Sequence, residues 1–587
     1  MTAARSLNEI KHVLLHTAGI GGFFGHEAFP DFDEEVMTMV LDEAARMSDE
    51  IFAPLNPVGD TQGSQLVGDG VKSPEGFKAA YQAFAEAGWV GLPFPESYGG
   101  QALPKLLSTA VMDILNSGNL SLTLCPTLSL GAIDALMSYG TEFQQKVFLP
   151  KLVSGEWTGT MNLTEPQAGS DVGALKTKAE PNGDGTYAIT GQKIYISWGD
   201  HDMAENIIHL VLARLPNAPD GTKGISLFLV PKTMVDEDGN LGAANAVKPI
   251  GVEHKMGLHA SPTCVMEYSG ATGWLVGEEN RGMMAMFVMM NNARLQVGLQ
   301  GTALCEAAYW QALDYAADRV QGKAAGVKGN AAILHHPDVQ NMLIKMRAYS
   351  DAARSLSYEA VMASDLAENA TSDTERKAAK LKEDILTPIA KSWPTDAAVD
   401  VTSLGVQVHG GMGYMAETQA GQLYRDSRIP PIYEGTNGIQ AIDLAGRKLG
   451  LEGGQAVHDL FDTLRTEVIG LKLKNLDEVP HIDALIGGLE LMQEETRWMQ
   501  SQNEPFSSLM GATAYQRQFG SLLASIYLMR GAILAKEAGA ANADDKLAIA
   551  KVFASYELPG YASTRTRVRL AEVLSSEVAK KLVGLEV

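Results

Sequence analysis

The spacing of apolar residues changes twice along this chain of 587 residues. From about residue 31 to 155 apolar residues recur every three or four positions, which predicts amphipathic helices. From about 156 to 280 they alternate with polar residues, as strands do, and after 281 the helical spacing returns. One predicted helix face comprises Val36, Val40, Ala44, Met47 and Ile51. The order therefore predicts helices, a β domain and helices again.

The β section contains three runs with strand character. "TYAITGQKIYIS" predicts a hairpin, with Tyr187 and Ile189 before the turn and Ile194 and Ile196 after it. "NIIHLVLARL" and "GISLFLVP" are two further strand-like runs, joined by the turn-rich "PNAPDGTKG". Together they predict a compact β domain of about a hundred residues.

Residues after about 450 also have helical spacing, so a further helical domain is expected. Its clearest stripe, which is typical of bundle packing, comprises Tyr515, Phe519, Leu522, Ile526, Met529 and Ile533. A chain of this length exceeds a single core. We therefore predict an α+β protein with an N-terminal extension (1–35), an N-terminal helical domain (36–158), a middle antiparallel β domain (159–280), a C-terminal helical bundle (281–450) and an additional helical domain (451–587).

The net charge of −23 argues against nucleic acid or an anionic membrane as the main partner, because phosphate binding needs a basic surface. The local basic run at Arg565, Arg567 and Arg569 is interpreted as a solvated face. The N-terminus shows no signal peptide, and no uninterrupted apolar stretch reaches 18 residues, so no membrane span is expected.

Three cysteines, Cys125, Cys264 and Cys305, lie far apart and form no CxxC pair. An odd number of scattered cysteines is typical of a reducing compartment rather than of a disulfide framework. Together with the absence of a signal peptide, this predicts a cytoplasmic protein.

Several common catalytic motifs are missing from the sequence. There is no GxxxxGK[ST] phosphate loop, no HExxH, no His/Cys cluster with zinc spacing and no GxSxG elbow, so no metal site is predicted. "GGMGYMAET" resembles a dinucleotide-binding glycine motif, but it follows a helical stretch rather than a strand. His409, directly before these glycines, is interpreted as a helix-end histidine.

Two polar stretches at the edges of the β section could bind a ligand rich in acceptors. "MNLTEPQAGSDVG" (161–173) offers hydroxyls and backbone N–H groups to a flavin ring or a pyrophosphate, and "KIYIS" (193–197) could place an aromatic ring and a hydroxyl beside it. Taken alone, each is better explained as structural turn chemistry; their combination favours a ligand site.

"PPIYEGTNGIQ" (430–440) contains one carboxylate, Glu434, between a proline pair and Gly435. It is either an exposed loop glutamate or a base whose position matters. Rigid prolines before it and a glycine after it would hold the carboxylate in place while the backbone approaches a ligand.

The motifs "LTEPQAGSD", "KIYISWG", "QVHGGMGY", "YRDSRI" and "IYEGTNGIQ", in this order over roughly residues 40–450, resemble the acyl-CoA dehydrogenases. The resemblance implies that fold, FAD as cofactor and oxidation of an acyl-CoA thioester to a trans-2-enoyl-CoA. It also implies electron transfer to an electron-transferring flavoprotein and at least a homodimer, because the family's FAD site uses two subunits.

In this resemblance Glu434 removes the α-proton while hydride passes from Cβ to flavin N5. A carboxylate sealed in a dry pocket is a better base than an exposed one, because burial raises its pKa. Some family members carry the base on the first helix of the second helical domain, directly before an arginine. Here that position is Ala293, before Arg294, so no competing carboxylate is present.

The resemblance also implies further contacts. Those with FAD are assigned to Leu163, Thr164, Ser170, Tyr195, Ile196, Ser197, Arg319, Gln407, Gly410, Gly411, Thr436 and Asn437. Those with the acyl-CoA substrate are assigned to Ser170, Asn291, Arg294 and Gly435. The sequence departs from the family pattern at "RVQG", which lacks the usual phenylalanine, at Gly438 in place of Gln, and at Asn291 in place of Asp.

The extra residues at both ends resemble a longer bacterial subgroup that includes enzymes oxidising 3-(methylthio)propanoyl-CoA, in dimethylsulfoniopropionate breakdown. Oxidation of straight-chain fatty acyl-CoAs in β-oxidation is the alternative. An acyl-CoA oxidase and a DNA-binding alkylation-response relative share the fold. The negative charge and the intact "YEGT" favour the dehydrogenase over the DNA-binding relative.

Overall fold

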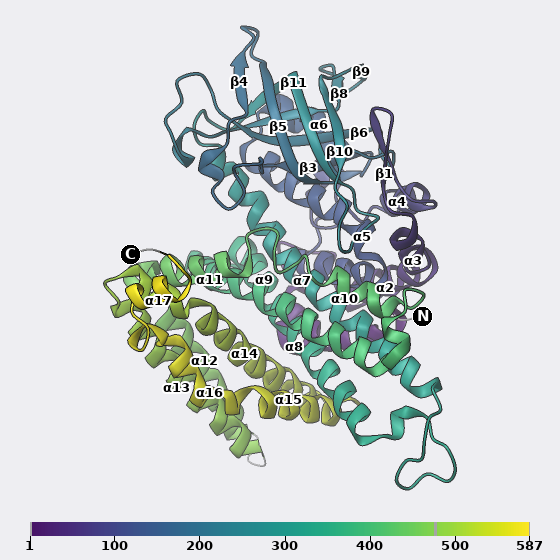
Figure 1. Ribbon diagram of the computed structural model, residues 1–587, viewed down its shortest axis with the longest axis vertical. Coiled ribbons are helices and arrows are strands. Elements are labelled where there is room, and N and C mark those ends of the chain that lie inside the picture. The colour runs from purple at the N-terminus through teal and green to yellow at the C-terminus, as the bar shows by residue number, and fades with distance from the viewer. Residues whose placement is uncertain (1–2, 475–477, 586–587) are drawn as a thin grey trace. The chain divides into compact units, whose positions relative to one another are not determined.

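The computed structural model describes residues 3–474 and 478–585, and the chain divides into two compact units (Figure 1). One unit comprises residues 36–296, and the other comprises residues 4–35 together with 297–587. The predicted α+β class and the order of helices, strands and helices are confirmed.

The first unit begins with helices around a long central helix, α5. These helices are α2 (Glu34–Met47), α3 (Ala53–Gln62), α4 (Phe77–Glu86), α5 (Lys105–Tyr139) and α6 (Glu142–Val153). α2 buries Met37 and Leu41 rather than the predicted Val36 and Val40, although Ala44 and Met47 are buried as expected. Apolar residues stand side by side at 36–37 and 40–41, so their spacing alone could not decide which of each pair faces the core.

A seven-stranded sheet forms the rest of this unit. Its strands are β3 (Trp157–Asn162), β4 (Lys178–Pro181), β5 (Tyr187–Ser197), β6 (Asn206–Ala213), β7 (Ser226–Pro231), β10 (Val247–Val252) and β11 (Thr263–Val276). The order is β3-β6-β7-β11-β5-β4, with β10 also pairing β11. All pairs are antiparallel except β3 with β6. Two small ribbons pair β1 (Gln65–Val67) with β2 (Gly70–Lys72) and β8 (Thr233–Val235) with β9 (Leu241–Ala244).

The predicted hairpin at 186–197 is wrong, because β5 runs through it as one continuous strand paired with β11. Gly191 does not make a turn. A Cβ there would lie 2.5 Å from Thr177 Oγ1 and 2.9 Å from Thr177 Cα, so the glycine permits the close approach of the 177 segment.

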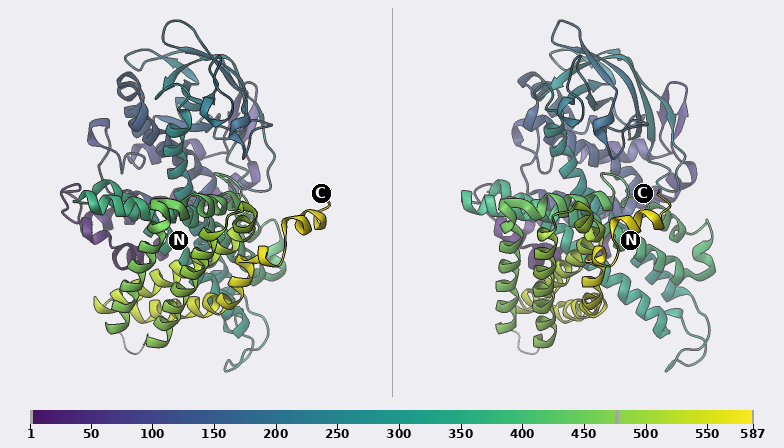
Figure 2. Two further views of the ribbon diagram at one scale, coloured as in Figure 1. Left: turned by 90° about the vertical axis from the view of Figure 1, so that its left-hand side faces the viewer. Right: turned by 60° about the vertical axis from the view of Figure 1, so that its left-hand side comes forward.

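The second unit is helical. Its helices are α1 (Ala3–His12), α7 (Gly282–Asp318, from residue 297 onward), α8 (Pro337–Asn369), α9 (Asp373–His409), α10 (Gln419–Asp426), α11 (Asn437–Gly446), α12 (Gln455–Lys474), α13 (Val479–Ser501), α14 (Pro505–Glu537), α15 (Ala543–Glu557), α16 (Tyr561–Val568) and α17 (Ser576–Leu582). All six residues of the predicted stripe on α14 are buried, which confirms its packing role. α17 buries no residue and projects from its unit (Figure 2, left).

The N-terminal extension is part of this second unit rather than a free arm. Ser6 on α1 donates to the Glu306 carboxylate on α7 at 2.7 Å. Arg530 on α14 donates to the carbonyl oxygen of Thr17 at 2.6 Å. The N-terminal extension and the additional C-terminal helices therefore pack in one unit.

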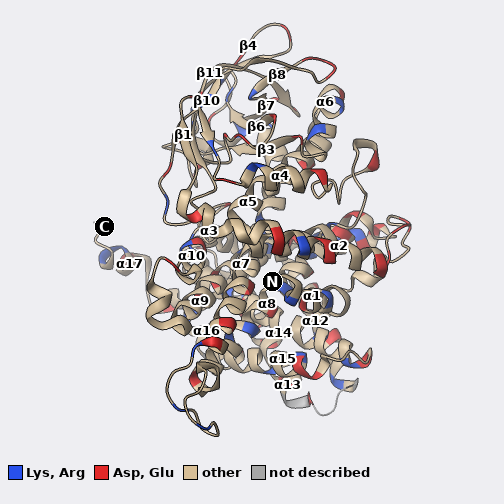
Figure 3. Ribbon diagram, turned by 90° about the vertical axis from the view of Figure 1, so that its right-hand side faces the viewer, with Lys and Arg blue, Asp and Glu red and all other residues tan. Residues whose placement is uncertain are grey.

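Within the part of the chain that the structure describes, two helices, α5 and α14, are long and apolar enough to cross a membrane by length and composition. Their most apolar stretches are 89% and 83% buried within the protein, as expected of core helices. Acidic and basic residues are interspersed along the described helices in the view of Figure 3.

Candidate functional site

Glu434 lies in the loop between α10 and α11, in a backbone conformation that few side chains adopt. Its φ is 54° and that of Gly435 is 80°. A non-glycine residue in this left-handed region costs about 1–3 kcal/mol and persists only where neighbouring contacts hold it. The Glu434 side chain is half-buried. The loop therefore presents one carboxylate on a strained and supported backbone.

The start of α11 anchors this loop to α9. Asn437 N–H donates to the Pro431 carbonyl at 2.9 Å. Asn437 Oδ1 accepts from the buried Lys391 ammonium at 2.8 Å, and its amide donates to Asp396 Oδ1 at 2.7 Å. The side chain of Asn437 thus forms hydrogen bonds within the protein. Its predicted contact with FAD stays a prediction. Thr436 caps α11 by accepting from Ile439 N–H at 3.1 Å.

Residues on both sides of Glu434 are held as well. Tyr433 OH donates to Gln300 Oε1 on α7. Burial and the neighbouring Glu434 charge raise the pKa of Tyr433, so this hydroxyl stays protonated as a donor. Gln440 Nε2 donates to the Glu434 carbonyl oxygen at 3.0 Å. The catalytic candidate therefore sits between two fixed side chains.

The loop of "LTEPQAGSD" is bound to β5 by a buried ion pair. Lys193 Nζ lies 2.9 Å from Glu165 Oε1, with side-chain exposures of 0% and 4%. The same ammonium donates to the Leu163 carbonyl at 3.0 Å, and Ile194 N–H donates to the Thr164 carbonyl at 2.9 Å. Leu163 and Thr164 are thus positioned through their backbones.

Next to this pair, β5 presents the predicted aromatic and hydroxyl residues. Tyr195 has φ 58° and is 59% exposed, whereas Ile196 is buried. The Ser197 carbonyl accepts from Thr160 Oγ1 at 2.8 Å. Ser170 is exposed in the neighbouring loop. The first unit therefore offers an outward aromatic ring beside several polar groups.

Acidification is expected to weaken the Glu165–Lys193 pair. Burial opposes the charge on Glu165, but the Lys193 ammonium and hydrogen bonds from Thr177 and Lys176 lower its pKa to about 2. An unfolded glutamate titrates near pH ~4.3. The stabilisation is therefore complete above about pH 4.3 and is lost as pH falls toward the folded pKa. Urea titrations from pH 3 to 7 should show the stability gap between wild type and Glu165→Gln narrowing on acidification; a gap independent of pH would contradict this.

The predicted substrate residues on α7 lie at the end of the first unit. Arg294 is buried and its Nη1 donates to Asn291 Oδ1 at 3.4 Å. Ala293 is buried between them in sequence and carries no carboxylate. The structure thus places Asn291 beside Arg294, as one polar pair.

The predicted cofactor residues of the second unit form another group. Tyr315 stacks on His409 with ring centroids 4.4 Å apart, which brings the end of α7 beside the end of α9. Arg319 directly follows the end of α7, and Gln407 precedes His409 on α9; both are exposed. His409 ends α9, as predicted. Gly410 and Gly411 are exposed, and a Cβ on either would meet open space.

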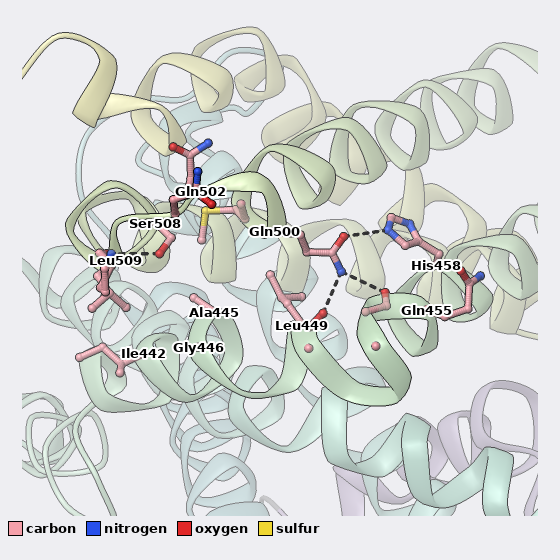
Figure 4. A pocket seen from close by; sticks show the side chains of 16 residues that line it. Ile442, Ala445, Gly446, Leu449, Gln455, His458, Gln500, Gln502, Ser508 and Leu509 are labelled. Atoms are coloured by element: carbon pink, nitrogen blue, oxygen red, sulfur yellow. Dashed lines mark hydrogen bonds between the residues drawn. The ribbon is translucent and has the colours of Figure 1, made fainter.

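A pocket of about 680 Å³ lies between α11, α12, α13 and α14 (Figure 4). Gln500 lines one side of it, donating to the carbonyls of Leu449 at 2.8 Å and Gly454 at 3.0 Å, while its Oε1 contacts His458 Nε2 at 3.0 Å (Figure 4). The described residues that line it include no Lys, Arg, Asp or Glu. Phosphate groups are held by Arg and Lys side chains. Because the described lining has neither, we assign neither CoA nor FAD to this pocket.

Sequence reasoning missed several residues that hold the site. Glu165 and Lys193 lie inside the quoted motifs, and the strand-like pattern around Lys193 could have flagged a lysine at a buried position. Gln440 ends the quoted "EGTNGIQ". Lys391 gave no signal, because its contact with Asn437 depends on how α9 packs. Within residues 3–474 and 478–585, no group of three His, Cys, Asp or Glu could hold a metal ion.

Comparisons with known proteins place these elements in one family. Residues 68–156, 160–271 and 280–449 match the N-terminal, middle and C-terminal domains of acyl-CoA dehydrogenase. Residues 463–573 match the "Acetyl-CoA dehydrogenase C-terminal like" domain.

Relatives and solved structures agree with these domain matches. The chain is 46% identical to 3-methylmercaptopropionyl-CoA dehydrogenase of Ruegeria pomeroyi over 78% of each chain. It is 33% identical to the broad-specificity linear acyl-CoA dehydrogenase FadE5 of Mycobacterium tuberculosis over 96% of each. The fold matches an acyl-CoA dehydrogenase complexed with FAD from Bacillus anthracis with a TM-score of 0.74, at 22% identity, over 94% of this chain and 91% of that one. The chain belongs to the acyl-CoA dehydrogenase family.

Proposed function

We propose that this protein is an FAD-dependent dehydrogenase of 3-(methylthio)propanoyl-CoA, with Glu434 as the base that removes the α-proton. The observation that carries the role of Glu434 is its support: a strained carboxylate-bearing residue held from both sides, in a loop anchored to α9. The product would be 3-(methylthio)acryloyl-CoA.

The residues present fit FAD. Tyr195 offers an exposed ring near polar groups, and Gly410 and Gly411 leave open backbone where a cofactor can approach. Arg319 supplies an exposed guanidinium, which suits a pyrophosphate. When bound, FAD supplies the acceptor for the hydride that leaves Cβ.

The chain itself must position the thioester and hold the proton. Glu434 Oε takes the α-proton, and the strained backbone fixes the direction from which it does so. The thioester oxygen gains negative charge as the proton leaves, and backbone N–H donors beside it would lower the barrier. Gly435, Asn291 and Arg294 remain the predicted contacts for the acyl-CoA.

The substrate proposal is supported by the Ruegeria pomeroyi relative, whose name specifies 3-methylmercaptopropionyl-CoA. A linear acyl-CoA is the second candidate, because the mycobacterial relative of broad linear specificity matches nearly the whole chain, including the additional helices.

Anaerobic bleaching of the flavin absorbance separates these two candidates. We expect 3-(methylthio)propanoyl-CoA to bleach the flavin with a higher second-order rate constant than straight-chain acyl-CoAs of four to sixteen carbons. A preference for a straight chain would instead assign the protein to β-oxidation. Failure of every thioester to bleach the flavin would overturn the proposed reaction.

For the electron acceptor we propose an electron-transferring flavoprotein, and for the assembly at least a homodimer in the cytoplasm. Rapid peroxide formation during aerobic turnover would instead indicate an oxidase. Tight binding of duplex DNA at moderate salt would indicate the DNA-binding relative, although the charge of −23 opposes it.

A further inference from the structure

Gln440 reaches back from the first turn of α11 to the loop that carries Glu434. Its side chain is fully buried, and Nε2 donates to the Glu434 carbonyl oxygen at 3.0 Å. Its own backbone N–H donates to the Thr436 carbonyl at 3.0 Å. The residue is therefore bound to the loop at two points, one of them on the peptide group that directly follows the Glu434 Cα.

That peptide group is bonded to the Cα that carries the carboxylate. The Glu434 carbonyl belongs to the unit between residues 434 and 435, and both residues have positive φ. Gln440 holds the carbonyl group that is bonded directly to the Glu434 Cα. A shift of this Cα, and of the side chain that it carries, would break the hydrogen bond, so Gln440 restrains the strained loop in place.

Gly435 and Gln440 are matched to each other. A Cβ on residue 435 would lie 2.7 Å from Gln440 Nε2, so the amide comes this close because residue 435 is glycine. Glycine at position 435 thus permits both the close approach of the Gln440 amide and the positive φ.

Packing alone does not explain a glutamine at position 440. Among the described residues, Gln440 Oε1 is buried and has no hydrogen-bond partner. An unsatisfied buried acceptor is unfavourable, and an apolar side chain of the same length would avoid it. What the amide adds over an apolar side chain of this length is its N–H group, which holds the Glu434 carbonyl.

We propose that Gln440 is a positioning residue that fixes the direction of the Glu434 carboxylate toward the α-proton of the thioester. This inference rests on the proposed role of Glu434 as the base. Gln440 does not touch the reacting atoms; it acts through the peptide group between Glu434 and Gly435.

Gln440→Met tests this, because methionine keeps the length of the side chain and removes the donor. Displacement of a catalytic group by about 1 Å can cost as much as a hundredfold in rate, so we expect flavin bleaching to slow by about tenfold or more. The dissociation constant for acyl-CoA and the FAD content should stay near wild type. The deuterium isotope effect with Cα-deuterated substrate should rise, since proton removal becomes more rate-limiting.

Gln516→Met is the matched control. Gln516 on α14 is also buried, and its Nε2 also donates to a backbone carbonyl, that of Pro388, at 3.1 Å. Its removal should lower the Tm at least as much as Gln440→Met does, with an unchanged bleaching rate and isotope effect. If Gln440→Met does not fold, Gln440→Asn makes the same test, because its amide is one methylene too short to reach.

Wild-type bleaching and isotope effect in Gln440→Met, or equal losses in Gln516→Met, would overturn the positioning role. Glu434→Gln separates this failure from failure of the proposed reaction. If Glu434→Gln is inactive and Gln440→Met is normal, Glu434 remains the base and the positioning role alone is wrong. If Glu434→Gln bleaches normally, the base lies elsewhere. The proposed role of Glu434 and the positioning role of Gln440 are then both wrong.

Discussion

Glu434→Gln is expected to abolish flavin bleaching by acyl-CoA under anaerobic conditions, while FAD and the thioester still bind. The amide keeps the size of the side chain but cannot accept the α-proton. A general base typically contributes about 10²- to 10⁴-fold. Ala293, the alternative position for the base implied by the resemblance, carries no carboxylate. Stopped-flow absorbance gives the bleaching rate, and a spectral titration with acyl-CoA gives the binding constant.

Glu452→Gln is the control for this substitution. Glu452 also has a positive φ, 50°, but it lies on the exposed segment after α11 and pairs with Lys377 at 3.1 Å. It should bleach at the wild-type rate. Bleaching of Glu434→Gln within a few-fold of wild type would rule out Glu434 as the base, and loss of FAD from this variant would show that it acts in cofactor binding.

Glu306→Gln is expected to cause the largest loss of stability in the second unit. The Glu306 carboxylate is fully buried and accepts from Ser6 Oγ and Ser350 Oγ, both at 2.7 Å, and from Trp310 Nε1 at 2.7 Å. Its ionic partners are the buried Arg354, at 3.2 Å, and Arg347, at 3.7 Å. Removing one charge of a buried pair costs about 3–5 kcal/mol, because the other charge stays in a dry environment.

The measurement is a urea titration of the intact protein followed by circular dichroism. Asp462→Asn is the matched control, because Asp462 is exposed and its pair with Arg465 spans 3.4 Å. Such a surface pair contributes about 0–1 kcal/mol. Equal losses in the two variants would contradict the structural role of the buried network. Burial opposes the charge on Glu306, but Arg354 and Arg347 hold its pKa well below the usual range, so its contribution should persist down to mildly acidic pH.

Sequence periodicity predicted the architecture well where one face of an element is apolar and the other is not. The α14 stripe from Tyr515 to Ile533 is buried throughout. The glycines after His409 were correctly separated from a dinucleotide motif, because they follow α9 rather than a strand. These patterns involve residues close together in the sequence, so they can be recognised without knowing the tertiary structure.

The wrong predictions concern positions where contacts with a distant segment determine the structure. In α2 adjacent apolar residues made two faces equally plausible, and packing selected Met37 and Leu41. Gly191 looked like a turn because nothing local indicates that Thr177 passes against it. The support of Glu434 by Gln440 likewise depends on a left-handed backbone at residue 434, which the sequence of a glutamate does not suggest.

The N-terminal extension and the additional C-terminal helices pack in one unit, which affects when their contacts can form during synthesis. Glu9 and Thr17 contact Lys546 and Arg530, which are translated much later. Glu9 and Lys546 are 537 positions apart, so on the order of a minute passes between their translation at bacterial speeds. During that interval the N-terminal segment lacks its partners on α14 and α15, so its packing is completed only late in synthesis.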